Sequence, residues 1–253
     1  MHGRAAYGVV VYRETSVGCL LDTWGEAMKI LIVSDIHANW PALSAVVASE
    51  PYDRLICLGD LVDYGPHPRP CLEYIRQHAD WVIRGNHDNA MGFDVDCGCR
   101  GDFRELSVST RAWHRTLVHE DDLTFLRSLP LHQEITLDGY CFYLGHAAPH
   151  DDLFTYLTPA TLPAAVADVQ TDFLFLGHTH LPLHQRLGNL TVVNPGSVGL
   201  PRDSGGKANY AVYEQGEVTL KQAIYDVEAT IADLQRGPLP AAVVERLAGL
   251  LRA

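Results

Sequence analysis

Basic residues are scarce in this chain of 253 residues. Lys and Arg total 19 against 31 Asp and Glu, which gives a formal net charge of −12. Binding to nucleic acid or to an anionic membrane surface requires clustered Lys and Arg side chains that contact phosphates. We therefore expect neither specific nucleic-acid binding nor membrane association. A pocket that holds cations could still attract a phosphate group.

Long apolar runs are also absent. No stretch approaches the roughly 20 apolar residues of a membrane-spanning helix. Near the start of the chain, Arg13 and Glu14 interrupt the apolar run 9–12 before a secretory signal could form. The sequence therefore predicts a cytoplasmic protein.

Cysteines are few, and their spacing completes no zinc motif. Cys57 and Cys141 lie in apolar runs typical of strands, where a free thiol behaves as a small hydrophobic side chain. Only Cys97 and Cys99, one residue apart in a glycine-containing loop, suggest redox or metal chemistry, and no second pair stands at zinc-site spacing. We expect reduced thiols and leave the role of this pair open.

The remaining composition is that of a globular protein, with 47% apolar and 20% charged residues. We expect one domain over residues 28–253 that includes C-terminal helices. Residues 1–27 differ in character, and Met28, Lys29 and Ile30 resemble a natural start that leads into a strand. This segment is either an added strand or arm, or an extension upstream of the true initiator, and the sequence leaves both open.

The first half of the domain predicts three consecutive βα units. Apolar runs at 30–33, 55–58 and 81–83 are typical of buried strands, and helices are expected at 41–50 and around Leu72 and Ile75. Each strand ends in polar residues, first Asp35 and His37, then Asp60 and Asp63, then Asn86 and His87. Asp35, Asp60 and Asn86 are 25 and 26 positions apart, the length of a strand and a crossover helix. The three motifs should therefore meet at one edge of a parallel sheet.

The second half is predicted to be richer in strands. Asp138 and Gly139 are a strong hairpin signal between strands 134–137 and 140–144, and the latter ends at His146. Strand 173–176 leads into His178 and His180. The apolar face of helix 241–251 should pack onto a sheet, with a dimer interface, and hence a homo-oligomer, as the alternative. The other expected elements are helices 102–117, 120–129, 162–169 and 227–235 and strands 183–187, 191–193, 210–213 and 218–225.

The polar strand ends supply more ligands than one tetrahedral ion needs. Two carboxylates, one amide and four imidazoles suit two borderline divalent ions such as Mn, Fe, Co, Ni or Zn, with Asp60 as a possible bridge. Two such ions activate a shared water and bind the phosphoryl oxygens of an in-line displacement, while the adjacent His87 can protonate the leaving group. The candidate ligands are Asp35, His37, Asp60, Asn86, His146, His178 and His180.

These motifs together resemble the calcineurin-like metallophosphoesterase superfamily. They are Asp35-x-His37, Gly59-Asp60-x-x-Asp63, Gly85-Asn86-His87-Asp88, His146 and Gly177-His178-x-His180. The run 194–199, followed by Pro201, Arg202 and Asp203, is similar to the small bacterial phosphodiesterase branch.

The resemblance implies an α/β fold, a four-layer α/β/β/α sandwich with two central mixed sheets. It further implies that Asp35, His37, Asp60 and His180 hold one metal and that Asp60, Asn86, His146 and His178 hold the other. In relatives the acid that matches Asp63 orients the histidine that matches His87. Arg202 is expected either to contact substrate or to play a structural role in its loop.

Two departures from the family pattern bear on function. Tyr64 stands where protein phosphatases carry arginine, which argues against phosphoprotein substrates. Ala147 replaces a glycine that often follows the third histidine, so His150 is a competitor of His146 as ligand. We expect hydrolysis of a small phosphate ester, with a phosphodiester favoured; the alternatives are a dinucleoside polyphosphate hydrolase and a non-catalytic scaffold of the same fold.

Overall fold

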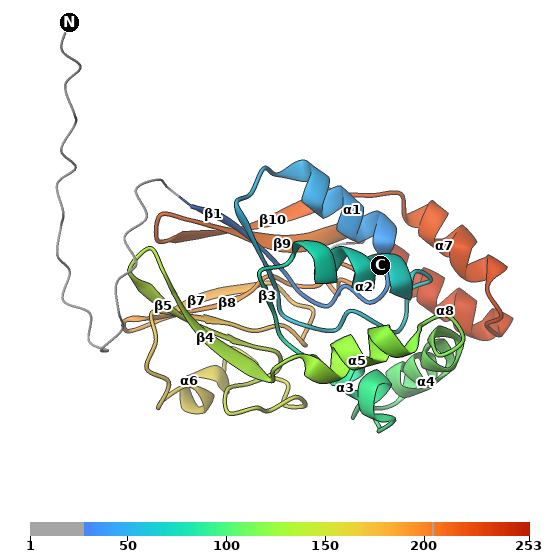
Figure 1. The fold of residues 1–253 in the computed structure, drawn as a ribbon, viewed down its shortest axis with the longest axis horizontal. Coiled ribbons are helices and arrows are strands. Elements are labelled where there is room, and N and C mark those ends of the chain that lie inside the picture. Colours follow the sequence, from blue (N-terminus) through green and yellow to red (C-terminus); the bar gives the residue numbers. More distant parts are fainter. Residues whose placement is uncertain (1–27, 204) are drawn as a thin grey trace, which may run out of the picture.

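The computed structural model describes residues 28–203 and 205–253, so the extension expected at residues 1–27 lies outside the described residues. Two five-stranded sheets form the centre of the fold (Figure 1). The turns of the three hairpins formed by residues 132–145, 183–194 and 207–224 lie at one end of the sheets, and the helices over residues 102–114, 227–236 and 241–252 lie at the other (Figure 1).

The first sheet contains the three predicted βα units. Its strand order is β10-β9-β1-β2-β3, in which β1, β2 and β3 are parallel and β9 and β10 are antiparallel to their neighbours. The carboxyl ends of the parallel strands therefore lie side by side, as the sequence spacing predicted. The strands are β1 (Lys29–Val33), β2 (Arg54–Cys57), β3 (Trp81–Val82), β9 (Lys207–Glu214) and β10 (Glu217–Ile224).

The second sheet is also mixed and has the order β4-β5-β6-β8-β7. The predicted hairpin between β4 and β5 is confirmed, since Asp138 and Gly139 connect them with φ of 53° and 77°. Positive φ at both residues is the geometry that a two-residue hairpin turn requires. The strands are β4 (His132–Leu137), β5 (Tyr140–Gly145), β6 (Phe173–Phe175), β7 (Leu183–Leu187) and β8 (Leu190–Asn194).

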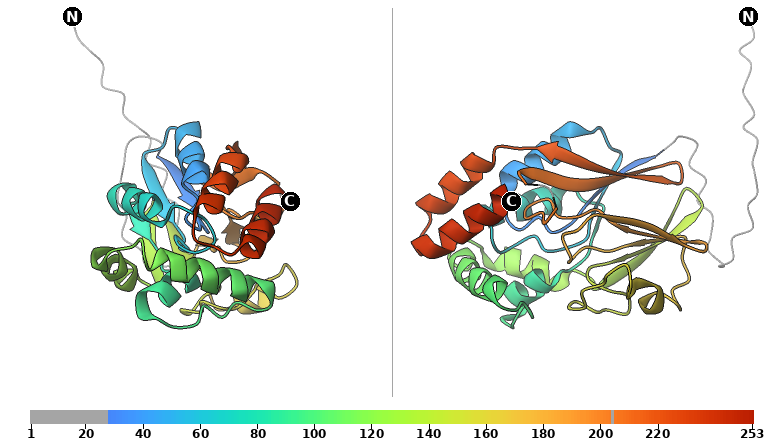
Figure 2. Two further views of the ribbon diagram at one scale, coloured as in Figure 1. Left: turned by 90° about the vertical axis from the view of Figure 1, so that its right-hand side faces the viewer. Right: turned by 180° about the vertical axis from the view of Figure 1, so that it is seen from behind.

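Strand β1 is buried on both faces, because alternate side chains point to opposite sides of a sheet. Ile30 and Ile32 join a core between the two sheets with Phe142 and Phe175. Leu31 and its neighbours on the other face pack under helices α1 and α2. The view from behind shows the two sheets as adjacent layers (Figure 2).

Helices cover the outer faces, which confirms the predicted α/β/β/α sandwich. α1 (Trp40–Ser49) and α2 (Pro68–His78) cover the first sheet. The layer over the second sheet is thin, because α6 (Leu162–Ala165) ends four residues before the predicted 169. α4 (Asp102–His114) and α5 (Glu120–Ser128) correspond to the other two predicted helices.

Helix α3 (Asn86–Phe93) was not predicted. Glycine at residue 92 is a poor helix former and weakens any helical pattern in this short segment. In the structure the Asp88 side chain accepts a hydrogen bond from the backbone N–H of Gly85, the cap of the helix, at 3.0 Å. An acid in the first turn also complements the helix dipole.

The C-terminal helices α7 (Val227–Arg236) and α8 (Ala241–Arg252) pack differently from the prediction. The apolar face of α8 is buried, but it packs mainly against α7 and α4, in an apolar cluster whose described residues include none from a strand. Tyr64 and Leu200 belong to the same apolar cluster. The expectation of packing onto a sheet is therefore wrong, because these helices extend beyond the strand ends (Figure 2).

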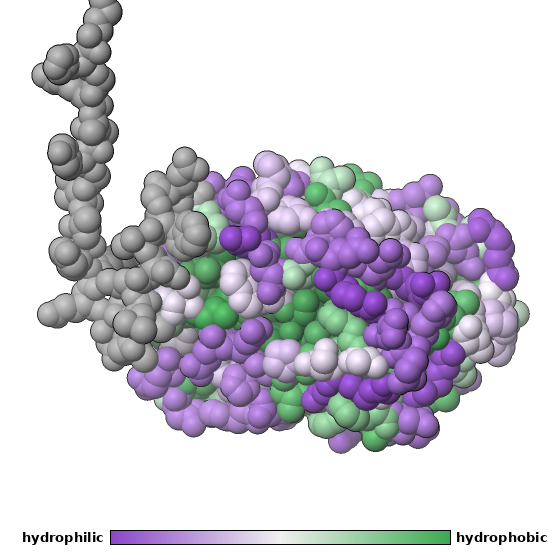
Figure 3. All heavy atoms as spheres, in the orientation of Figure 1, coloured by the Kyte–Doolittle hydropathy of each residue, from purple (hydrophilic) through white to green (hydrophobic). Residues whose placement is uncertain are grey.

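The surface in Figure 3 mixes hydrophilic and hydrophobic residues, and hydrophilic ones prevail over α2. Among the described residues, no helix combines the length and apolar character needed to cross a bilayer.

Candidate active site

The loops that follow β1 and β2 carry the first predicted ligands and are tied together by their backbones. The N–H of Asp35 donates to the carbonyl of Gly59 at 3.0 Å, and the N–H of His37 donates to the carbonyl of Asp60 at 2.9 Å. Asp35, His37 and Asp60 are almost fully buried. The parallel strands therefore hold both loops at one sheet edge.

Many residues of the site adopt left-handed backbone conformations. The φ values of Asp35, His37 and Asp60 are 52°, 45° and 56°, and those of His178 and His180 are 65° and 61°. Each such conformation in a residue other than glycine costs on the order of 1–3 kcal/mol and tends to occur at functional sites. The tight turns direct the side chains inward, into one cluster.

The second sheet brings its histidines to the same place. His146 follows β5, and His178 and His180 follow β6. The backbone N–H of His178 donates to the carboxylate of Asp35 at 3.0 Å, which links the two sheets directly. Both halves of the sequence thus contribute to one buried cluster.

His37 and His180 face each other through atoms that cannot form a hydrogen bond between neutral rings. Their Nε2 atoms are 3.0 Å apart. Nδ1 of His37 lies 2.9 Å from the carbonyl of Val62, and Nδ1 of His180 lies 2.6 Å from the carbonyl of Leu200. A carbonyl only accepts, so each Nδ1 carries the proton and each neutral Nε2 presents a lone pair. Two facing lone pairs repel unless a cation or a proton lies between them.

The same arrangement recurs around His146. Its Nδ1 lies 2.7 Å from the carbonyl of Leu58, so its Nε2 is an acceptor in the neutral ring. That Nε2 is 3.1 Å from Oδ1 of Asn86 and 3.2 Å from Oδ2 of Asp60. The Asn86 amide is oriented by its own donor, since Nδ2 donates to the carbonyl of Cys97 at 2.8 Å. Three acceptors therefore converge.

These acceptors fall into two groups that fit metal ions. Donor atoms of Asp35, His37 and His180 lie within 4.8 Å of one another, as do those of Asp60, His146 and His178. Oδ2 of Asp60 stands between the groups, 3.2 Å from Nε2 of His146 and 3.9 Å from Nε2 of His37. His178 places Nδ1 3.1 Å from Oδ1 of Asn86. Buried nitrogen and oxygen donors of this kind suit borderline divalent cations.

Burial and neighbouring charges move the pKa values of these histidines in opposite directions. Burial, assisted by His180, lowers the pKa of His37 to about 3. Burial also acts on His146, but the Asp60 carboxylate outweighs it and raises the pKa of His146 to about 10. The Asp60 carboxylate, 3.2 Å from Nε2 of His146, therefore favours positive charge at this place in the cluster.

His87 lies beside this cluster and is held by Asp63. Its Nδ1 is 2.7 Å from Oδ2 of Asp63, and Nε2, on the other side of the ring, lies 3.3 Å from Sγ of Cys99 and 3.4 Å from the hydroxyl of Tyr64. Burial lowers the pKa of His87, but the charges of Asp60 and Asp63 prevail and raise it to about 9. A protonated imidazole of this kind is a competent general acid near neutral pH.

Sequence reasoning missed several residues that support this pair. The guanidinium of Arg111, on α4, forms a buried ion pair with Asp63. His114 accepts a hydrogen bond from the N–H of Asp63 at 3.1 Å. Arg111 and His114 belong to a helix whose place in the fold no local pattern revealed. Their spacing along one helical face was the only available signal.

The sequence assigned no role to Asp88, although this residue is part of the motif 85–88. It is fully buried and accepts hydrogen bonds from the backbone N–H groups of Asp60 at 2.7 Å and Leu61 at 2.8 Å, besides that of Gly85. Asp88 therefore fixes the loop after β2 to the loop after β3.

Two open alternatives can be compared with the structure. His146 lies in the cluster, whereas His150 is exposed and lies 3.2 Å from Asp168. Arg202 is exposed at the rim, with its guanidinium 4.5 Å from the ring of Phe103 and 6.0 Å from that of Tyr156. Tyr156 in turn packs on His178, with ring centroids 4.1 Å apart.

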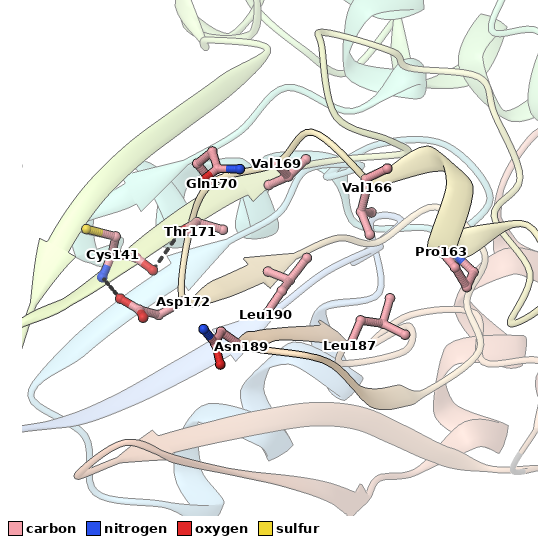
Figure 4. Close-up of a pocket in the computed structure, with 11 residues that line it drawn as sticks. Cys141, Pro163, Val166, Val169, Gln170, Thr171, Asp172, Leu187, Asn189 and Leu190 are labelled. Carbon is pink, nitrogen blue, oxygen red and sulfur yellow. Dashed lines mark hydrogen bonds between the residues drawn. The ribbon is translucent and has the colours of Figure 1, made fainter. Parts of the chain in front are cut away.

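A separate cavity of about 340 Å³ lies at the second sheet, between Pro163, Asp172 and Leu190 (Figure 4). Within its lining, the N–H of Cys141 donates to Asp172 at 2.9 Å and Oγ1 of Thr171 donates to the carbonyl of Cys141 at 2.7 Å. None of the predicted ligands lines this cavity. The candidate catalytic residues therefore lie in the buried cluster and not in this cavity.

Two mixed sheets that meet at a buried cluster of carboxylates and imidazoles define the class of metal-dependent phosphoester hydrolases. The chain belongs to the calcineurin-like phosphoesterase superfamily, whose domain model matches residues 28–217.

Three proteins from other organisms are similar in sequence to most of this chain. An uncharacterized protein of Methanocaldococcus jannaschii, MJ0912, is 32% identical over 86% of this chain and 96% of its own. Phosphodiesterase YfcE of Escherichia coli K12 is 30% identical over 74% of this chain and 88% of its own. A metallophosphoesterase structure from Sphaerobacter thermophilus has a TM-score of 0.76 and 32% identity, with 88% of this chain and 99% of that one covered.

Proposed function

We propose that this enzyme hydrolyses a small phosphodiester with two divalent transition-metal ions. The observation that carries the proposal is the convergence of acceptor atoms, above all the facing Nε2 atoms of His37 and His180 at 3.0 Å. One ion would be held by Asp35, His37, Asp60 and His180. The other would be held by Asp60, Asn86, His146 and His178. Manganese, iron, nickel, cobalt and zinc all suit this mixture of donors.

Bound ions would supply a nucleophile by lowering the pKa of water and would neutralise charge on the phosphoryl oxygens. The residues of the chain then control the leaving group. His87 donates the proton on Nε2 to the departing alkoxide oxygen, while Asp63 holds Nδ1 and stabilises the protonated ring. A positioned acid of this kind contributes roughly 100- to 10,000-fold to the rate.

The residues at the edge of the buried cluster favour a small phosphate ester that carries a second substituent. Arg202 carries a positive charge close to Phe103 and Tyr156, and a cation beside aromatic rings can bind a phosphate oxygen while the rings contact an apolar group. A monoester lacks the second substituent that would lie there. The diester is therefore the favoured substrate.

The test is hydrolysis by purified protein loaded with Mn²⁺ or Ni²⁺. Chromogenic phosphodiester and monoester substrates and diadenosine tetraphosphate are compared for wild type, His87→Gln and His150→Gln. We expect the diester to be turned over fastest, with loss of turnover in His87→Gln and not in the exposed His150→Gln. Equal turnover in all three proteins would overturn the proposal.

The number of metal ions bound per chain distinguishes an enzyme from a non-catalytic scaffold of the same fold. Elemental analysis of the reconstituted protein should give about two transition-metal ions per chain if both groups bind a cation. Binding of less than one ion per chain, together with no turnover, would favour a non-catalytic scaffold. Fast cleavage of the dinucleotide with slow cleavage of the diester would instead identify a dinucleoside polyphosphate hydrolase.

A further inference from the structure

The cysteine pair that the sequence left without a role lies against the proposed acid. Cys97 and Cys99 flank Gly98 in the loop between α3 and α4, and both are buried. Sγ of Cys99 is 3.3 Å from Nε2 of His87. The fold therefore places two thiols on the face of His87 opposite its contact with Asp63.

The three side chains have the separations of a metal site. One nitrogen of His87 and the sulfurs of Cys97 and Cys99 all lie within 4.8 Å of one another. With metal–sulfur bonds of about 2.3 Å and metal–nitrogen bonds of about 2.0 Å, tetrahedral ligands stand roughly 3.5–3.8 Å apart. Sγ of Cys99 and Nε2 of His87 are already about this far apart, and small side-chain shifts would bring all three atoms to this geometry.

The surroundings hold the three donors in place. Nδ1 of His87 is bound to Asp63, and a carboxylate on the second nitrogen is the usual support for a metal-binding histidine. Asn86 donates to the carbonyl of Cys97, and Sγ of Cys97 lies 3.3 Å from Oγ of Ser107. The hydroxyl of Tyr64, 3.5 Å from Sγ of Cys99, closes another side of the cluster.

The donor chemistry differs from that of the two groups described above. Those groups offer carboxylate, amide and imidazole atoms, whereas two of the three atoms here are sulfur. Soft thiolates select zinc and similar thiophilic ions over manganese. Two thiolates also neutralise a divalent charge, so such an ion can be held beside other cations.

We propose that Cys97, Cys99 and His87 form an additional site for a thiophilic divalent ion such as Zn²⁺ or Cd²⁺, and that occupation of this site inhibits the enzyme. Binding releases the protons of both thiols and of Nε2 to the solvent. His87 then has no proton to donate to a leaving group. Binding of this ion depends on the two thiolates and not on the phosphoesterase activity. Only the inhibition rests on the proposed function.

Cadmium spectroscopy tests the site directly. Protein that is reduced and already loaded with Mn²⁺ is titrated with Cd²⁺. The free thiols are counted on a separate sample with a colorimetric reagent. We expect thiolate-to-cadmium charge-transfer absorption that saturates at one equivalent per chain. The absorption should be lost in the Cys97→Ser/Cys99→Ser double variant and retained in Cys141→Ser, a cysteine outside the cluster. Absence of the band in wild type, or its survival in the double variant, would overturn the proposal.

A measurement on the unmodified chain guards against misfolding of the double variant. The chemical shift in cadmium NMR moves with the number of sulfur ligands, so wild type should show one signal typical of two sulfurs. A signal without sulfur coordination would refute the site.

The effect of Cd²⁺ on diester hydrolysis tests whether occupation of the site inhibits the enzyme. One equivalent of Cd²⁺ should reduce diester hydrolysis by wild type by roughly 100-fold or more, because a general acid contributes roughly 100- to 10,000-fold to the rate. The double variant should keep its own rate when Cd²⁺ is added. The two proposals fail separately: a cadmium band without hydrolysis would contradict the proposed function alone, and hydrolysis without a band would contradict the additional site alone.

Discussion

Oδ2 of Asp88 accepts a hydrogen bond from the backbone N–H of Asp60 at 2.7 Å, so a residue of α3 fixes the loop that carries the proposed bridging carboxylate. The same carboxylate group also binds the N–H of Leu61 and Gly85. Replacing one of its oxygens by an amide NH₂ group leaves buried N–H groups without an acceptor.

Asp88→Asn should therefore lower the free energy of unfolding by about 1–3 kcal/mol. It should also reduce the metal content, because Asp60 loses its fixed position. Denaturant unfolding and elemental analysis measure the two effects. Asp122→Asn, a buried acid on α5 that pairs with Arg76, is the matched control and should keep full metal content.

Asp63 should set the alkaline limit of activity. The pKa of His87 is raised to about 9 from an ordinary value of 6.5, so its acid form is lost as the pH rises through about 9. Asp63→Asn removes a charge that holds this proton, and the alkaline limb of the rate profile should move to lower pH. The rate at neutral pH should fall roughly 10- to 100-fold. An unmoved limb would contradict the assignment.

The same shift has a consequence for stability. A raised pKa in the folded protein means that the contribution of His87 is complete below pH 6.5 and disappears as the pH rises through about 9. The thermal stability of wild type relative to His87→Gln should decline over this window. A difference that grows with pH would contradict the predicted direction.

Gly85 should tolerate no side chain. A Cβ atom at this position would lie 2.0 Å from Oδ1 of Asp60 and 2.4 Å from its backbone nitrogen. Gly85→Ala should cost about 1–3 kcal/mol of stability and abolish binding of the second ion. Gly249→Ala is the control, because a Cβ there meets open space on α8 and should stabilise the helix by up to about 1 kcal/mol.

Metal removal should destabilise the fold, because it leaves lone pairs of His37 and His180 facing each other. Ions present at 1,000 times their dissociation constant add about 4 kcal/mol to the free energy of unfolding, so chelation should lower the melting temperature by roughly 10 °C. His146→Ala should weaken this response and the exposed His150→Ala should not. Equal responses of the two variants in thermal scans would contradict the choice of His146.

Much of the site could be predicted from the sequence alone. Apolar runs of strand length predicted β1, β2 and β6. The polar residues directly after these strands are the ones that meet in the cluster. The similar spacing from Asp35 to Asp60 and on to Asn86 predicted parallel strands with adjacent ends. These patterns can be recognised in the sequence, because the burial of a strand and the length of a crossover depend on consecutive residues.

Only the tertiary structure decided how these residues are supported. Arg111 meets Asp63 across 48 positions of sequence, and Cys99 meets His87 through a loop of no regular pattern. The burial of α8 against α4 and α7 also depends on distant neighbours. The sequence alone determined which side chains reach the sheet edge. Contacts between distant segments decided their protonation, orientation and partners, because the electrostatic environment of a buried group is set by all the atoms that surround it.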